Sequence, residues 1–102
     1  MVHVVATIEV HEGKRSDLLQ AFQKLTPLVR AERGCIEYAA TIDVPTAIKV
    51  QVPLRSNVVT VIEKWESIEA LTAHLAAPHM ATYREDVKDI VIGVALQVLA
   101  PV

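Results

Sequence analysis

Two histidines, the side chains best suited to acid–base chemistry at neutral pH, lie in one short segment of this chain. The stretch WESIEALTAHLAAPHMATY, residues 65–83, contains the only tryptophan together with His74, His79 and Tyr83. His79 and Tyr83 are four residues apart, so on a helix the imidazole and the phenol can meet. The segment is either one wall of a pocket or an accident of surface composition. A pocket lined in this way would do proton chemistry on a small molecule.

A carboxylate lies just ahead of this segment, among apolar neighbours. In the predicted strand 58–65, Glu63 and Trp65 share one face, because side chains alternate along a strand. Two interpretations of Glu63 stay open: a salt bridge at the end of the sheet, or a pocket acid or base with a raised pKa. Two further aromatic residues, Tyr38 and Phe22, are candidates for either the core or the pocket wall.

Other standard catalytic and cofactor motifs are missing from the sequence. His74 and His79 are separated by Pro78 and come without thiolates or an HExxH pattern, so we expect no bound metal. The three glycines do not cluster, which excludes a dinucleotide fingerprint and a phosphate-cradling loop. No serine occupies a nucleophile elbow, and Cys35 has no histidine beside it in sequence. We therefore expect no nucleotide or flavin cofactor.

Length and composition predict one soluble domain, residues 1–102. The chain is 52% hydrophobic but only 4% aromatic, so aliphatic side chains must build its core. A net charge of -2 without a basic run makes nucleic acid a poor partner. One cysteine cannot form an internal disulfide, no signal peptide is visible, and the apolar run 90–102 is too short for a membrane helix. We expect a cytoplasmic protein without membrane contact.

The hydrophobic pattern predicts six elements in the order β, α, β, β, α, β. A helix from about Lys14 to Val29 should kink near residues 24–26, because Pro27 removes a backbone donor, and Gly34 is placed to end it. The connection 45–57 contains a possible short strand at 47–52. The predicted strands are residues 3–10, 35–43, 58–65 and 93–102.

The second helical region begins at Ser67, a good N-cap. His74 then falls at the boundary of the predicted apolar stripe, neither in the core nor opposite it. Pro78 fits the first turn of a new helical piece. The predicted stripe is Ile68, Leu71, Thr72 and Leu75, and the inward residues of the second piece are Met80, Tyr83, Val87 and Ile90.

This element order most simply forms a ferredoxin-like α+β fold, a four-stranded antiparallel sheet with both helices on one face. Strands 58–65 and 93–102 are apolar on both faces, whereas the helices can cover only one. An uncovered apolar sheet face exceeds what soluble monomers tolerate, so we expect a homodimer that packs sheet against sheet.

Three segments carry a family resemblance: ERGCIEY from Glu32, VIEKWESIEALTAHLAAPHMATY from Val61, and the closing apolar strand. Together they resemble the antibiotic-biosynthesis monooxygenase (ABM) superfamily, most closely the small bacterial quinol monooxygenases. The most specific part is the run from Glu63 to Met80, and the resemblance covers essentially the whole chain. It implies a dimeric α+β barrel with a pocket between sheet and helices. It also implies oxidation of quinols or polycyclic phenols by molecular oxygen without metal, haem or flavin.

The resemblance suggests a role for each candidate residue. His74 or His79 takes the quinol proton, while Glu63 orients an imidazole or binds a hydroxyl. Tyr83 orients His79. A deprotonated quinol can give an electron to oxygen itself, so the protein needs only to bind it, remove a proton and stabilise the anion. The aromatic residues expected to bind the substrate are Trp65, Tyr83, Tyr38 and Phe22.

Two other functions stay open. Relatives that isomerise a phosphorylated autoinducer-derived dione are similar across the H-x-x-x-P-H part, and Arg55 or Arg84 could bind the phosphate. Trp65 and the long LRSN-containing loop favour quinol oxidation over isomerisation of a dione. The haem-degrading branch of the superfamily has an Asn in its first strand. The corresponding strand of this sequence, HVVATIEV, contains none, so we do not expect haem degradation. The third function is a non-catalytic small-molecule binding module. The physiological substrate, the identity of the base and any gating by residues 45–57 are not determined by the sequence.

Overall fold

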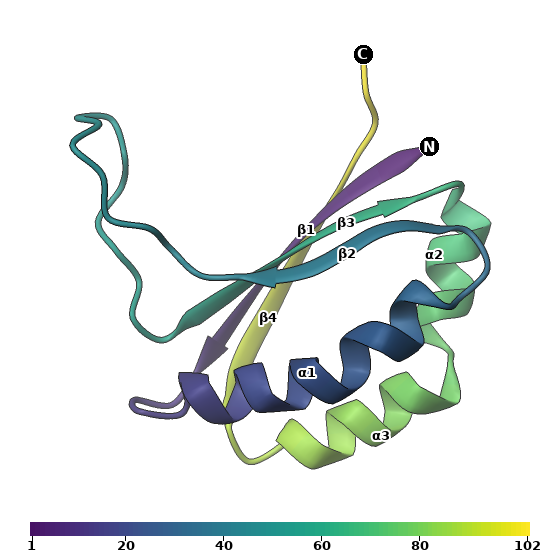
Figure 1. The fold of residues 1–102 in the computed structure, drawn as a ribbon, viewed down its shortest axis with the longest axis horizontal. Helices are drawn as coiled ribbons and strands as arrows, with labels where there is room; N and C mark the ends of the chain where they lie inside the picture. The colour runs from purple at the N-terminus through teal and green to yellow at the C-terminus, as the bar shows by residue number, and fades with distance from the viewer.

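The computed structural model describes all 102 residues and places three helices on one face of a four-stranded antiparallel sheet (Figure 1). The sheet order β2-β3-β1-β4 is that of the predicted ferredoxin-like fold. None of the helices has the length and apolarity that crossing a bilayer requires. The elements are β1 (Val2–Val10), α1 (Arg15–Arg30), β2 (Cys35–Thr41), β3 (Val58–Trp65), α2 (Ile68–Leu75), α3 (Pro78–Val87) and β4 (Val91–Leu99).

The core lies between the sheet and the helices. Every second residue of β1 is buried, and the register pairs Val4 with Glu63 and Ile8 with Val59 of β3, so both strands turn the same face toward the helices. Glu63 thus occupies a core position. The helix α1 adds a buried stripe at i, i+4, i+7 and i+11, formed by Leu18, Phe22, Leu25 and Val29.

The helix α1 ends earlier than Gly34, where the sequence placed its end. It continues past Pro27 and ends at Arg30, with Ala31 as C-cap. A short turn then leads to Gly34, whose φ of 87° is the left-handed conformation that glycine adopts without strain. The backbone N–H of Glu66 donates to the carbonyl of Gly34 at 2.8 Å. Gly34 therefore fixes the turn between α1 and β2 against the start of α2.

Replacing Gly34 by alanine is expected to destabilise the fold more than the same change at Gly13. Both glycines have positive φ, 87° and 80°, so each substitution carries a backbone strain of about 1–2 kcal/mol. A Cβ on Gly34 would lie 2.6 Å from the Cβ of Ala70, whereas one on Gly13 would meet nothing within 4 Å. The clash adds about 1–3 kcal/mol. Urea unfolding of both variants measures the difference, and equal losses would contradict the close packing of Gly34 on α2.

The short helix α2 buries a different face from the one predicted. Ser67 caps it as expected, its hydroxyl accepting from the N–H of Ala70 at 3.1 Å. However, the predicted stripe residues Ile68 and Leu75 are exposed, and Leu71 and His74 are buried. The prediction of a boundary position for His74 was therefore wrong. With only eight residues, α2 takes its orientation from the burial of Leu71 together with the packing of His74 on the Trp65 ring.

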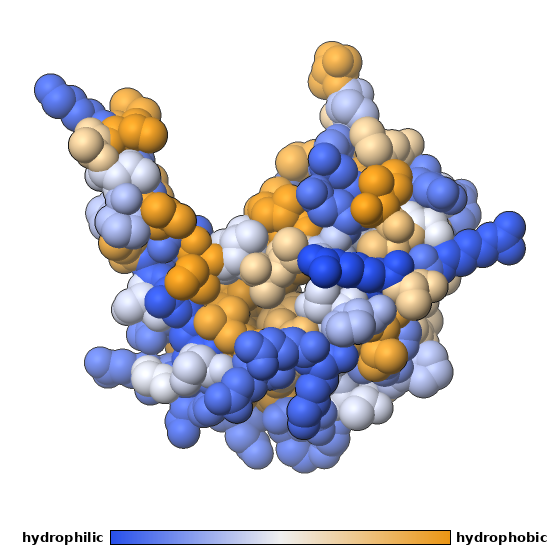
Figure 2. Space-filling model, in the orientation of Figure 1, coloured by the Kyte–Doolittle hydropathy of each residue, from blue (hydrophilic) through white to orange (hydrophobic).

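Residues 42–57, called the arm below, extend away from the sheet (Figure 1). The short strand predicted at 47–52 was wrong, because the arm contains no strand and its backbone instead makes a turn, with Gln51 N–H donating to the carbonyl of Ile48 at 3.2 Å. Figure 2 shows apolar side chains along the arm, facing solvent. The exposed large apolar residues of the arm are Ile42, Val44, Ile48, Val50, Val52 and Leu54.

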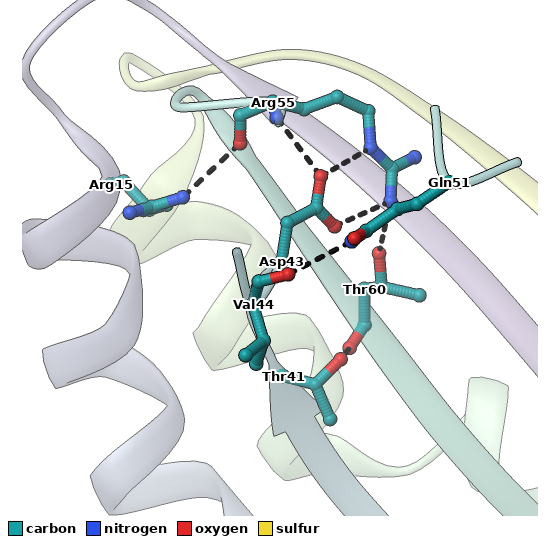
Figure 3. A network of polar contacts seen from close by, with 7 residues as sticks. All are labelled: Arg15, Thr41, Asp43, Val44, Gln51, Arg55 and Thr60. Carbon is teal, nitrogen blue, oxygen red and sulfur yellow. Dashed lines mark hydrogen bonds and ion pairs between the residues drawn. The ribbon is translucent and has the colours of Figure 1, made fainter. Parts of the chain in front are cut away.

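Ion pairing fixes the base of the arm (Figure 3). Arg55 donates from Nη2 and Nε to the two carboxylate oxygens of Asp43 at 2.8 and 3.0 Å, and its backbone N–H donates to the same carboxylate at 2.9 Å. These bonds lower the pKa of Asp43 to about 2. Arg15 of α1 donates to the carbonyl of Arg55 at 3.1 Å. The arm is thus anchored to the domain at both of its ends.

Candidate functional site

Glu32, a residue that sequence reasoning missed, joins the two histidines of the predicted pocket. Its Oε2 lies 2.8 Å from Nδ1 of His74 and 2.7 Å from Nε2 of His79. The three residues, called the triad below, come from the turn after α1, from α2 and from α3. An ionised carboxylate can only accept hydrogen bonds, so both nitrogens donate to Glu32. A neutral His79 then keeps its free lone pair on Nδ1, and a neutral His74 keeps its own on Nε2.

Local backbone features bring these three residues together. The turn that ends at Gly34 carries Glu32, whose N–H donates to the carbonyl of Val29 at 2.9 Å. Pro78 opens α3 after an extended Ala77, as the sequence predicted, so the chain changes direction between the two histidines. His79 can therefore face the same carboxylate as His74, although five residues separate them. The glutamate precedes the histidines by 42 and 47 residues, so no periodicity could reveal the contact.

Aromatic side chains surround His74 and connect the other predicted site residues. The His74 ring lies 4.6 Å from the ring of Trp65, at 31°, and 5.5 Å from that of Tyr38 in an edge arrangement. Phe22 lies 6.3 Å from Tyr38 and 5.2 Å from Tyr83. The structure thus brings together all seven residues predicted from the sequence. Burial and these contacts fix the orientation of the His74 ring.

The two tyrosines of this shell are neutral at physiological pH. Burial raises the pKa of Tyr83 to about 12, and burial and the nearby Glu63 carboxyl raise the pKa of Tyr38 above its usual range. Tyr83, expected to orient His79, makes no hydrogen bond to it: Nε2 of His79 is bonded to Glu32, and the Tyr83 ring packs on Phe22. Glu32 takes the orienting role instead.

Glu63 is a buried carboxyl and not the member of a salt bridge. Its Oε1 accepts a hydrogen bond from Nε1 of Trp65 at 2.9 Å, and no lysine or arginine pairs with it. Burial raises the pKa of Glu63, and this effect outweighs the opposing hydrogen bond from Trp65 and the nearby His74. Of the two interpretations left open by the sequence, the raised pKa agrees with the structure. No hydrogen bond joins Glu63 to His74 or His79, whose Nδ1 and Nε2 are bonded to Glu32 instead.

Replacing Glu63 by glutamine is expected to stabilise the fold at neutral pH and to flatten its pH dependence. A carboxyl whose pKa is raised on folding stabilises the folded state fully below its unfolded pKa, and that contribution is lost as pH rises through the folded pKa. The glutamine side chain keeps an oxygen for the N–H of Trp65 but cannot ionise. Thermal unfolding of both proteins between pH 4 and 8 measures the effect. A variant that falls below wild type at every pH would contradict the buried, destabilised carboxylate.

Two surface clefts border the site. The larger, about 460 Å³, lies between α1 and α3 and is called the α1/α3 cleft below; His79, Tyr83 and Leu25 are among its lining residues. The second, about 420 Å³, lies along α1 and β2 and includes Phe22. Neither is lined by His74 or Trp65. The side chain of His79 is 24% exposed and that of His74 only 2%, so the triad is open to the surface through His79.

Comparison with known proteins identifies relatives over the whole chain. The family model described as antibiotic biosynthesis monooxygenase matches residues 1–86. A protein of Escherichia coli (strain K12) named probable quinol monooxygenase YgiN is 38% identical over 103 residues, covering 99% of this chain and 98% of its own. Among solved structures, Rv0793 of Mycobacterium tuberculosis is similar with a TM-score of 0.80, 27% identity and coverage of 99% and 94%. PA3566 of Pseudomonas aeruginosa has the same TM-score at 23% identity, with coverage of 99% and 93%.

Proposed function

We propose that this chain, which belongs to the antibiotic biosynthesis monooxygenase family, oxidises a quinol or a related phenolic aromatic with molecular oxygen. The observation that carries this proposal is the triad, two imidazoles on one carboxylate, open to a cleft on one side and packed against aromatic rings on the other. The 38% identical relative named as a probable quinol monooxygenase supports the substrate class.

In this proposal His79 is the base. It lines the α1/α3 cleft, and the hydrogen bond to Glu32 leaves its Nδ1 free to accept a phenolic proton. The imidazolium that forms then keeps its Nε2–H bond to the carboxylate, which stabilises the positive charge. His74 shares the same carboxylate and holds Glu32 in place from the buried side. Glu32 is therefore the residue that orients the base.

The quinol itself supplies all the electrons that reduce the oxygen molecule. A quinol that reacts with one molecule of oxygen gives a quinone with one new ring oxygen and one molecule of water, so the balance needs no external reductant. The protein contributes binding, proton removal and stabilisation of the anion. Burial and the carboxyls of Glu32 and Glu63 raise the pKa of the Cys35 thiol, which makes thiolate chemistry at this site unfavourable. We propose that neither metal nor flavin takes part in the reaction.

Substrate binding is proposed at the inner end of the α1/α3 cleft, where His79 and Tyr83 lie beside Leu25. The Phe22 ring packs on Tyr83 and continues the apolar surface toward Tyr38. Trp65 is fully buried behind His74. In this arrangement Tyr83 contacts the substrate ring and Phe22 supports Tyr83 from behind, while Trp65 and Tyr38 support the histidine.

The direct test is product analysis with isotopic oxygen. The protein is incubated with a reduced naphthoquinol under ¹⁸O₂, and the product is analysed by mass spectrometry. One labelled oxygen in the quinone ring above the nonenzymatic background supports the monooxygenase. Quinone formation above background but without label contradicts it and indicates a simple two-electron oxidation of the quinol. No turnover with measurable binding also contradicts it and favours the binding module.

The isomerase alternative receives no support from the cations near the site. Arg55 is paired with Asp43, and Arg84 donates to the carbonyl of Leu75 at 2.8 Å. Lys24 is the one cation that lines the α1/α3 cleft, together with Asp17 and Asp86. A phosphorylated dione would meet more negative than positive charge there, which is unfavourable for phosphate recognition.

We also propose that the protein is a homodimer that packs through its sheet, with the arm reaching the partner. Val94, Leu96 and Val98 of β4 pair with buried residues of β1, so they lie on the helix-facing side of the sheet and not on the opposite face that the sequence predicted. They are 63%, 42% and 37% exposed. Figure 2 shows a hollow between the arm and the rest of the domain, with apolar side chains on its walls. Apolar surface of this extent is typical of an interface. The dimer and the cytoplasmic location are predictions from the sequence.

Replacing Val50 by aspartate is expected to raise the dimer dissociation constant by at least about tenfold, because an unpaired charge would be buried at the interface. Val50 is 90% exposed and lies in the arm. Ile68→Asp is the matched control, since Ile68 is also exposed and apolar but begins α2, which lies at the opposite end of the domain from the arm (Figure 1). Light scattering after size exclusion measures both variants. A monomeric wild type at micromolar concentration contradicts the dimer.

A further inference from the structure

The triad has the composition and spacing of a metal site as well as of a proton-transfer site. His74 Nδ1, His79 Nε2 and a Glu32 oxygen all lie within 4.8 Å of one another. From the sequence alone only the two histidines were apparent, and two ligands are too few. Glu32 supplies the third and comes from a different part of the chain.

We propose that Glu32, His74 and His79 bind a divalent transition-metal ion of the Zn²⁺ class. Two imidazole nitrogens and one carboxylate oxygen are ligands that suit zinc and its neighbours, whereas Mg²⁺ and Ca²⁺ require mostly oxygen ligands. Three protein ligands leave at least one coordination position for water. The inference goes beyond the proposed reaction, because it rests on ligand geometry and holds whether or not a quinol is the substrate. An ion held by Nε2 of His79 leaves the proton on Nδ1, so the metal-bound form is distinct from the metal-free form in which His79 acts as the base.

The two spacings between Glu32 and the histidines are close to what such an ion requires. With bonds of about 2.0–2.1 Å, ligand atoms around a tetrahedral ion lie roughly 3.3 Å apart. Glu32 Oε2 is now 2.7 and 2.8 Å from the two nitrogens, so the carboxylate has to move by only about half an ångström. Each neutral imidazole shifts its proton to the other ring nitrogen and presents the freed lone pair to the ion. Binding therefore requires a short outward shift of the carboxylate, together with a spacing of roughly 3.3 Å between the two imidazole nitrogens, which now lie within 4.8 Å of each other.

The residues around the triad favour a cation, and the α1/α3 cleft connects the triad to solvent. The buried His74 ring is held against Trp65 at 4.6 Å, so one ligand is fixed in advance. His79 lines the α1/α3 cleft, where Asp17 and Asp86 outnumber Lys24. Negative charge along this path raises the local concentration of cations. An ion can thus reach the triad from solvent without unfolding any element.

The test is metal binding by the full-length protein after chelation and dialysis. Zn²⁺ is titrated by calorimetry, and Co²⁺ is titrated by its visible absorption, which reports the coordination geometry. We expect one ion per chain in wild type and a loss of affinity of at least about tenfold in His79→Ala and in Glu32→Gln. Both residues are partly exposed, so these variants should fold, which circular dichroism checks.

The matched control is His11→Ala, which removes an exposed histidine outside the triad. Its affinity for Zn²⁺ should equal that of wild type. No stoichiometric binding by wild type, or equal binding by wild type and both triad variants, overturns the proposal, as does loss of binding in His11→Ala. Because quinol oxidation is assayed with a chelator present, failure of the metal site and failure of the proposed reaction are separate results.

Discussion

Replacing both His74 and His79 by alanine is expected to lower the rate of quinol oxidation by about 10²–10⁴-fold, the usual contribution of a positioned acid–base group. Glu32 contacts both imidazoles, so His79 as the base and His74 as the buried support of the carboxylate act through the same group. The double variant removes the base together with the residue that holds Glu32 in place and therefore has the larger effect. The rate is measured as initial oxygen uptake with a reduced naphthoquinol, after subtraction of nonenzymatic autoxidation.

Because His74 is buried, the double variant needs controls that separate loss of the base from loss of the fold. Glu32→Gln keeps the shape of the side chain but removes the charge that stabilises an imidazolium, so it should lower kcat more than it changes KM. His11→Ala alters an exposed histidine and should leave the rate unchanged. Unchanged oxygen uptake in a folded double histidine variant would contradict the assignment of the triad as the base.

Trp65→Ala is expected to cause the largest loss of stability, about 3–5 kcal/mol, a large part of the roughly 5–15 kcal/mol of a typical domain. Trp65 is fully buried, packs on His74 and donates its Nε1–H to Glu63 at 2.9 Å. Its removal leaves a cavity beside the site and a buried carboxyl without its donor. Urea unfolding with circular dichroism measures the change in the free energy of unfolding.

Trp65→Phe separates packing from hydrogen bonding. Phenylalanine keeps an aromatic ring against His74 but removes the donor to Glu63, and leaving that acceptor unpaired costs about 1–3 kcal/mol. Loss of the donor should also raise the pKa of Glu63 further, since that hydrogen bond opposes the effect of burial. A Trp65→Ala variant as stable as Trp65→Phe would contradict the packing role of this residue.

Features set by local sequence were predicted correctly. Ser67 and Pro78 begin α2 and α3, because capping and the fixed φ of proline act within a few residues. The β-branched run of β3 gave its bounds, 58–65, and alternation placed Glu63 and Trp65 on one buried face. The element order then restricted the sheet to the observed topology.

Features set by contacts between distant segments were not predictable from the sequence. Periodicity placed His74 at a helix boundary, because it assumed that aliphatic residues alone define the buried side, whereas the buried side is made by Leu71 and by His74 stacked on Trp65. Glu32 has no helical or strand pattern to distinguish it from other surface glutamates. Its role depends on the turn at Gly34, which brings it to two helices.

The arm shows a further reason why a prediction from the sequence can be wrong. Residues 47–52 alternate like a strand, but a strand needs a neighbour to pair with, and this chain offers none there. Asp43 and Arg55 anchor the arm, and its apolar side chains are exposed. This exposure is explained if these side chains pack on a second copy of the chain. Sequence pattern within one chain does not contain that information.

The most direct measurement is the initial rate of oxygen uptake by the metal-stripped protein with a reduced naphthoquinol and a chelator present. The triad predicts a rate clearly above nonenzymatic autoxidation, and the loss of this excess in the double histidine variant. A rate no faster than autoxidation across a small panel of quinols would contradict cofactor-free quinol oxidation by Glu32, His74 and His79.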